Sequence, residues 1–234
     1  LLPIKRICDE AEKRGIVTLI DGAHASGMIA LNLHDLNCDF YAASGHKWQC
    51  GPGSTGLLYV RDNASRVAEF FPTNRKPFYA VNSSLAGLGL PLNWTLQYKG
   101  NDNYPALRAL ADACDLWAEI GRDRIEDRVK GLSTLTKSLI QDVFPWALVY
   151  SPDHPDMTSG ITSFNPFSDQ YDLTVVKEFR DRLREEYGYI VRYTNFHVGL
   201  KDTQHTYALR ISSDLFHDED DVEGLIDAMT DLYA

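Results

Sequence analysis

The sequence has few cysteines and no long apolar run, and both shortages limit what the chain can be. Its four cysteines, Cys8, Cys38, Cys50 and Cys114, form no CxxC pair. This spacing argues against a disulfide framework and favours free thiols in a reducing compartment. No apolar stretch approaches the roughly 20 residues that a helix needs to cross a bilayer, and no signal peptide is visible.

Basic residues are also in the minority, since 23 lysines and arginines stand against 33 aspartates and glutamates. The formal net charge of -10 argues against nucleic acid and against anionic membranes as partners. The chain begins at Leu1 rather than at a methionine, so we expect a cut or processed piece of a longer protein. The expected location is the cytoplasm, with the periplasm after signal removal as the alternative.

The N-terminal residues show the alternation of an α/β fold. Residues 4–14 have helical character, and Gly15 is a natural end for that helix. Three short runs follow at 16–21, 38–44 and 55–60, and each is expected to be a buried parallel strand. Strands separated by helical or loop segments predict an α/β sheet that is covered on both faces.

The C-terminal half has a different pattern, that of a small α+β unit. Two long helices are expected first, from Tyr104 to about Gly121 and over 123–142. After Pro152, strand and helix patterns occupy 159–165, 172–187, 189–194, 207–212 and the residues from Asp218 onward. The expected domains are therefore 1–150, which includes connecting helices, and 151–234.

Two polar clusters follow expected strands of the α/β part. Asp21-Gly22-Ala23-His24 stands at the end of one strand, and Ser44-Gly45-His46-Lys47 at the end of another. Ligands bind at the carboxyl ends of strands in open α/β sheets, so both clusters are expected to face one crevice. These residues match what pyridoxal 5'-phosphate (PLP) requires: a lysine for an imine, an acid beside the pyridine nitrogen, and donors for the phosphate and the ring hydroxyl.

Each of these residues also has an ordinary structural interpretation. Asp21 can cap a helix after a turn, and the histidines can be satisfied loop residues. Lys47 can be a solvated loop lysine, as most lysines are. The spacing alone favours these interpretations over a cofactor site.

A longer match changes that balance. The stretch DGAHASGMIALNLHDLNCDFYAASGHKWQCGPGSTGLLYVRD, which begins at Asp21, is similar to the cofactor-binding core of class V aminotransferases. These are PLP enzymes of fold type I, and the stretch is most similar to members called isopenicillin N epimerase-like. The resemblance implies that Asp21 pairs with the pyridine nitrogen, that His24 bonds the phenolic oxygen, and that Ser44 and His46 flank the phosphate. It makes Lys47 the Schiff-base lysine, so that Lys47 and Asp21 are the expected catalytic residues, and it implies no metal.

The resemblance also implies binding residues further along the chain. In this family a Gly-Thr pair reaches the phosphate of the partner subunit's cofactor, and the nearest match here is Gly100-Asn101, with an amide in place of the hydroxyl. The segment YALRISSDLFHDEDDV resembles the one whose arginine binds the substrate α-carboxylate, which implies Arg210. Arg192 is a second candidate for substrate binding. Both arginines can also be strand residues in surface ion pairs.

The family resemblance predicts the architecture as well. Residues 1–150 would be the C-terminal part of the PLP-binding large domain, with a mostly parallel sheet, and 151–234 the small α+β domain. The N-terminal part of the large domain would be missing, which would leave an apolar sheet edge. A homodimer is expected, because fold-type-I enzymes form their sites at a subunit interface.

The same resemblance leaves the reaction open among several outcomes. An epimerase or aminotransferase acting on an amino acid or an amino-acid-containing peptide is the main expectation. A C–S lyase and a periplasmic enzyme that tailors a siderophore (pyoverdine) side chain are alternatives. A cysteine desulfurase is disfavoured because no cysteine follows Cys114, and His46 argues against kynureninase-like enzymes. A catalytically inactive PLP-fold scaffold protein is the alternative of another class.

Overall fold

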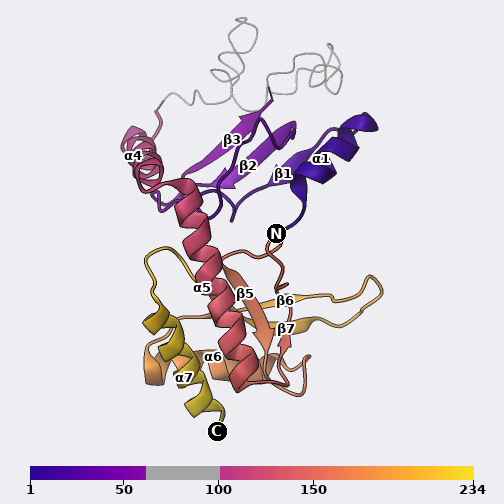
Figure 1. The fold of residues 1–234 in the computed structure, drawn as a ribbon, viewed down its shortest axis with the longest axis vertical. Helices are drawn as coiled ribbons and strands as arrows, with labels where there is room; N and C mark the ends of the chain where they lie inside the picture. The colour runs from indigo at the N-terminus through magenta and orange to yellow at the C-terminus, as the bar shows by residue number, and fades with distance from the viewer. Residues whose placement is uncertain (62–100) are drawn as a thin grey trace, which may run out of the picture. The chain divides into compact units, whose positions relative to one another are not determined.

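The computed structural model describes residues 1–61 and 101–234, and the chain divides into two compact units (Figure 1). We call Ile4–Gly27 with Leu31–Glu119 the N-terminal unit, and Leu1–Pro3, Met28–Ala30 and Ile120–Ala234 the C-terminal unit. Among the described residues, no helix has the length and apolarity that crossing a membrane requires. The domain boundary expected between residues 150 and 151 stays a prediction.

The N-terminal unit contains a three-stranded sheet of order β1-β2-β3. Its elements are α1 (Ile4–Lys13), β1 (Leu19–Asp21), β2 (Phe40–Ser44), β3 (Gly56–Val60) and α4 (Tyr104–Ile120), the last residue of which belongs to the other unit. Strand β1 is parallel to β2, as expected, with Asp21 in register with Ala42.

The expectation of a mostly parallel sheet is wrong at β3, which runs antiparallel to β2 and makes the sheet mixed. The loop between them folds back on itself, since Gly45 N donates to Thr55 O at 2.8 Å and Gly51 N to Gly45 O at 2.8 Å. A parallel pair needs a crossover of about a dozen residues or more, which this loop does not provide. Strand β3 is also less buried than expected, with Leu58 53% exposed.

A buried carboxylate joins the starts of β1 and β2. The Asp39 side chain, which is 0% exposed, accepts hydrogen bonds from Thr18 N at 2.8 Å and Thr18 Oγ1 at 3.0 Å. Beside it, Cys8, Cys38 and Tyr41 form a small apolar cluster. These contacts fix the register that brings the ends of the two strands to one edge.

The C-terminal unit contains an antiparallel sheet of order β4-β5-β7-β6. Its elements are α5 (Arg122–Val143), β4 (Leu148–Val149), β5 (Ile161–Asn165), α6 (Leu173–Tyr187), β6 (Arg192–Phe196), β7 (Thr206–Ser212) and α7 (Glu219–Tyr233). Helices α5 and α7 pack against each other, and their apolar faces join the sheet in one core (Figure 1). This core includes Ile140, Phe164, Leu183, Leu209 and Met229.

The helix ends of this unit follow the signals in the sequence. The Asp172 side chain caps α6 by accepting from Thr174 N and Val175 N, and Gly188 ends it with φ 80°. Helix α7 begins with a capping box between Asp218 and Asp221. Side-chain acceptors at a helix start and a left-handed glycine at its end satisfy backbone groups that the helix itself leaves unpaired.

Candidate functional site

The structure places both polar clusters at one edge of the sheet in the N-terminal unit. Parallel strands β1 and β2 end at Asp21 and Ser44, so the loops that follow them start side by side. The Asp21 residue is exposed, and its Oδ1 accepts a hydrogen bond from Ala23 N at 3.0 Å. This bond fixes the direction of the carboxylate relative to the turn that leads to His24.

Lys47 and His24 come into direct contact although they stand 23 positions apart. Lys47 Nζ lies 3.2 Å from His24 Nε2, and both side chains are half-buried. On the other side of the same ring, Trp48 Nε1 donates to His24 Nδ1 at 3.1 Å. The amine, the imidazole and the indole therefore form one row, with His24 in the middle.

Three further residues, Ser44, His46 and Asn101, are expected around a cofactor phosphate. His46 Nδ1 lies 3.3 Å from the Thr55 carbonyl oxygen, and His46 is exposed. Ser44 is half-buried at the end of β2. Asn101 is exposed, whereas Gly100 lies outside the described residues. Their roles stay predictions.

The two candidate arginines belong to the C-terminal unit and face each other there. Arg192 on β6 and Arg210 on β7 are register partners in an antiparallel pair, which puts both side chains on the same face of the sheet. Arg192 is exposed and Arg210 is half-buried. The Nε atom of Arg210 is buried and has no hydrogen-bond partner among residues 1–61 and 101–234. Such a donor is costly unless a ligand or water satisfies it.

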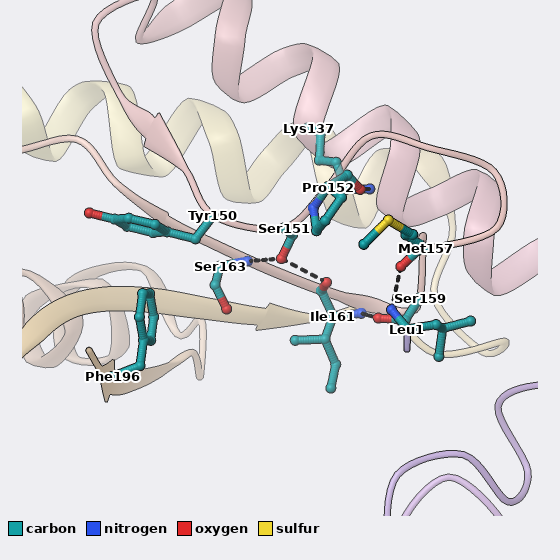
Figure 2. Close-up of a pocket in the computed structure, with 10 residues that line it drawn as sticks. All are labelled: Leu1, Lys137, Tyr150, Ser151, Pro152, Met157, Ser159, Ile161, Ser163 and Phe196. Carbon is teal, nitrogen blue, oxygen red and sulfur yellow. Dashed lines mark hydrogen bonds between the residues drawn. The ribbon is translucent and has the colours of Figure 1, made fainter. Parts of the chain in front are cut away.

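A cavity of about 370 Å³ opens in the C-terminal unit, with Ser163, the register partner of Arg210, in its wall. Figure 2 shows Ser151 between Ser163 N and Ile161 O, with hydrogen bonds of 2.8 and 3.2 Å. Tyr150 and Phe196 also line it. The cavity therefore combines hydroxyl groups with aromatic surface.

The cavity is also lined by a buried lysine that the sequence analysis did not single out. Lys137 is 2% exposed, and its Nζ donates to Pro152 O at 2.9 Å and to Thr158 Oγ1 at 3.2 Å. The nearest carboxylate oxygen, on Asp153, lies 3.8 Å away on a largely exposed side chain. Burial therefore lowers the pKa of Lys137, and Asp153 offsets this only in part. Its place in helical register with buried Ser133 and Ile140 was the available sequence signal.

The buried ammonium of Lys137 predicts a pH-dependent stability. Because the folded protein holds this proton less tightly than the unfolded chain, stability should rise as the pH passes the lowered pKa toward the ordinary value of 10.5. Denaturant midpoints of wild type and Lys137→Met, measured from pH 7 to 10, should show the wild type gaining on the variant. A constant or opposite difference would contradict this assignment.

Comparison with known proteins agrees with this fold. The chain is 29% identical over 241 residues to isopenicillin N epimerase from Streptomyces clavuligerus, covering 98% of this chain and 56% of that protein. It is 28% identical over 243 residues to the enzyme of the same name from Amycolatopsis lactamdurans, covering 99% and 56%. The chain thus spans about half the length of these curated relatives.

A solved structure shows the same fold. The apo structure of a cysteine desulfurase from Thermococcus onnurineus NA1 matches with a TM-score of 0.73 at 23% identity, over 98% of this chain and 56% of that one. A family model described as aminotransferase class-V matches residues 1–225. Since this match extends over both units, the chain belongs to the class V aminotransferase family.

Proposed function

We propose that this chain is the Lys47-bearing part of a PLP-dependent enzyme of the epimerase or aminotransferase type, acting on an amino acid or an amino-acid-containing peptide. The observation that carries the proposal is the Lys47–His24 contact of 3.2 Å at the strand edge that also holds Asp21. An amine, an imidazole and a carboxylate are the groups that PLP needs for attachment, for its ring oxygen and for its ring nitrogen. The donor set therefore fits the cofactor.

Each residue then has a defined task. Bound PLP supplies an electron-accepting ring that stabilises negative charge at the substrate α-carbon. Asp21 would keep a proton on the ring nitrogen, while its Oδ1 stays anchored by Ala23 N. His24 would bond the ring oxygen, and Ser44 and His46 would flank the phosphate. Lys47 would hold the cofactor and, as a free amine, would move the proton at the substrate α-carbon.

Arg210 is proposed to bind the substrate carboxylate. Its buried Nε, which has no hydrogen-bond partner within the described part of the chain, supports this, because a carboxylate would satisfy the donor. Arg192 stands directly opposite, and two like charges in register destabilise a sheet unless an anion lies nearby. The substrate class is therefore one with a free carboxylate.

The cysteine positions in the sequence also separate the competing reactions. No cysteine follows Cys114, so the segment after it has no thiol that could accept sulfur as a desulfurase requires. A C–S lyase and a siderophore side-chain tailoring enzyme remain alternatives, and both would use the same Lys47 and Asp21. A catalytically inactive scaffold is the alternative of another class, which the cofactor experiment below separates from all enzymes. We further propose a homodimer in which Asn101 reaches the phosphate at the partner's site.

The test is covalent attachment of the cofactor. The complete protein, incubated with PLP and reduced with borohydride, should carry one PLP group on the peptide that contains Lys47, and the visible absorption band should disappear. Lys47→Ala should lose both signals. Lys137→Met, which removes the buried lysine of the C-terminal unit, should keep both. Absence of a Lys47 adduct at saturating PLP would reject the enzyme and favour the scaffold.

A further inference from the structure

The residue that follows the lysine, Trp48, is almost fully buried, and its indole points at His24. Trp48 is 5% exposed, and its Nε1 donates to His24 Nδ1 at 3.1 Å. An indole N–H is a donor only and cannot accept. This bond therefore requires His24 Nδ1 to be free of a proton.

The state of the imidazole follows from that requirement. A neutral imidazole has one N–H and one acceptor nitrogen. With Nδ1 accepting from Trp48, the proton of His24 must be on Nε2, the atom that lies 3.2 Å from Lys47 Nζ. The protonated imidazolium is excluded as well, because it would put two N–H donors face to face at Nδ1.

We propose that Trp48 is a positioning residue that holds His24 as its Nε2–H tautomer, so that the imidazole presents an N–H donor on the side where Lys47 Nζ lies. This inference deepens the proposed function and rests on it for the acceptor that this N–H would meet, the ring oxygen of the cofactor.

Trp117 offers a matched control in the same unit. It is 6% exposed, and its Nε1 donates to the Gly27 carbonyl at 2.9 Å. Trp48→Phe and Trp117→Phe each remove one buried indole N–H bond, but only the first removes a bond to His24. A purely structural role of either tryptophan would lower stability without changing the tautomer of His24.

A readout without cofactor tests the inference on the complete apoprotein. Long-range ¹⁵N–¹H spectra of the histidine rings, assigned with His24→Gln, report the tautomer of His24. Wild type and Trp117→Phe should show the Nε2–H pattern. Trp48→Phe should lose this tautomer preference, because the donor that keeps Nδ1 free of a proton is gone.

The opposite results are equally clear. An Nδ1–H pattern in the wild type, or equal effects of Trp48→Phe and Trp117→Phe, would overturn the inference. If Trp48→Phe does not fold, 3-benzothienylalanine at position 48 keeps the ring shape and lacks only the N–H, and the same two outcomes apply. Because this readout omits PLP, failure of the borohydride experiment would reject the proposed function and leave the tautomer result standing.

Discussion

Asp21→Asn is expected to lower turnover about 100- to 1000-fold, the range found when a preorganised electrostatic stabiliser of a transition state is removed. The asparagine carbonyl can still accept the hydrogen bond that Ala23 N donates to Asp21 Oδ1 at 3.0 Å. The turn after β1 should therefore survive, while the negative charge that keeps the ring nitrogen protonated is lost. The substitution thus separates the chemical role of Asp21 from its structural one.

The measurement is exchange of the α-hydrogen of amino acids in D₂O, followed by NMR, with the complete protein and PLP. It requires only proton transfer at the α-carbon and so covers an epimerase and an aminotransferase alike. Asp21→Asn should still form the borohydride-stable adduct on Lys47, with a thermal midpoint close to that of wild type. Asp21→Ala should lose stability as well, because it lacks the acceptor for Ala23 N. Exchange by Asp21→Asn within threefold of wild type would remove Asp21 from the proposed role.

Gly27→Ala is expected to destabilise the N-terminal unit by about 3 kcal/mol or more, the combined cost of overpacking and of a left-handed backbone. Gly27 has φ +88°, and a Cβ there would lie 2.3 Å from Gln49 N and 2.4 Å from the Trp48 carbonyl carbon. Both neighbours are backbone atoms and cannot move aside as a flexible side chain would. The loop after β1 would have to move away from the Lys47–Trp48–Gln49 segment.

Two other glycines separate the causes of this loss. Gly15 also has a left-handed φ, +66°, but nothing lies within 4 Å of its Cβ position. Gly15→Ala should therefore cost only about 1 kcal/mol, the price of the conformation alone. Gly53 has open space and no left-handed φ, so Gly53→Ala should change stability by less than about 0.5 kcal/mol. Denaturant unfolding of the three variants should give this order, and equal effects at Gly27 and Gly15 would refute the close approach.

Local features of this protein could be predicted from the sequence because they depend on neighbours within a few positions. Asp172 and Gly188 mark the two ends of α6, and Asp218 begins α7, through capping bonds that span two or three residues. The strand ends at Asp21 and Ser44 were also expected, and a shared edge followed from parallel β1 and β2. The family followed from one dense stretch around Lys47.

Tertiary structure alone decided the direction of β3 and the contacts of single side chains. The loop hydrogen bonds from Gly45 N to Thr55 O and from Gly51 N to Gly45 O turn the chain back, and no periodicity in the sequence encodes that reversal. The Trp48–His24 bond joins residues 24 positions apart. The hydrogen bonds of buried Lys137 join it to Thr158, 21 positions away, and to Pro152, 15 positions away. Hydrogen bonds require distances within a few tenths of an ångström, and only the packed chain sets distances between residues so far apart in sequence.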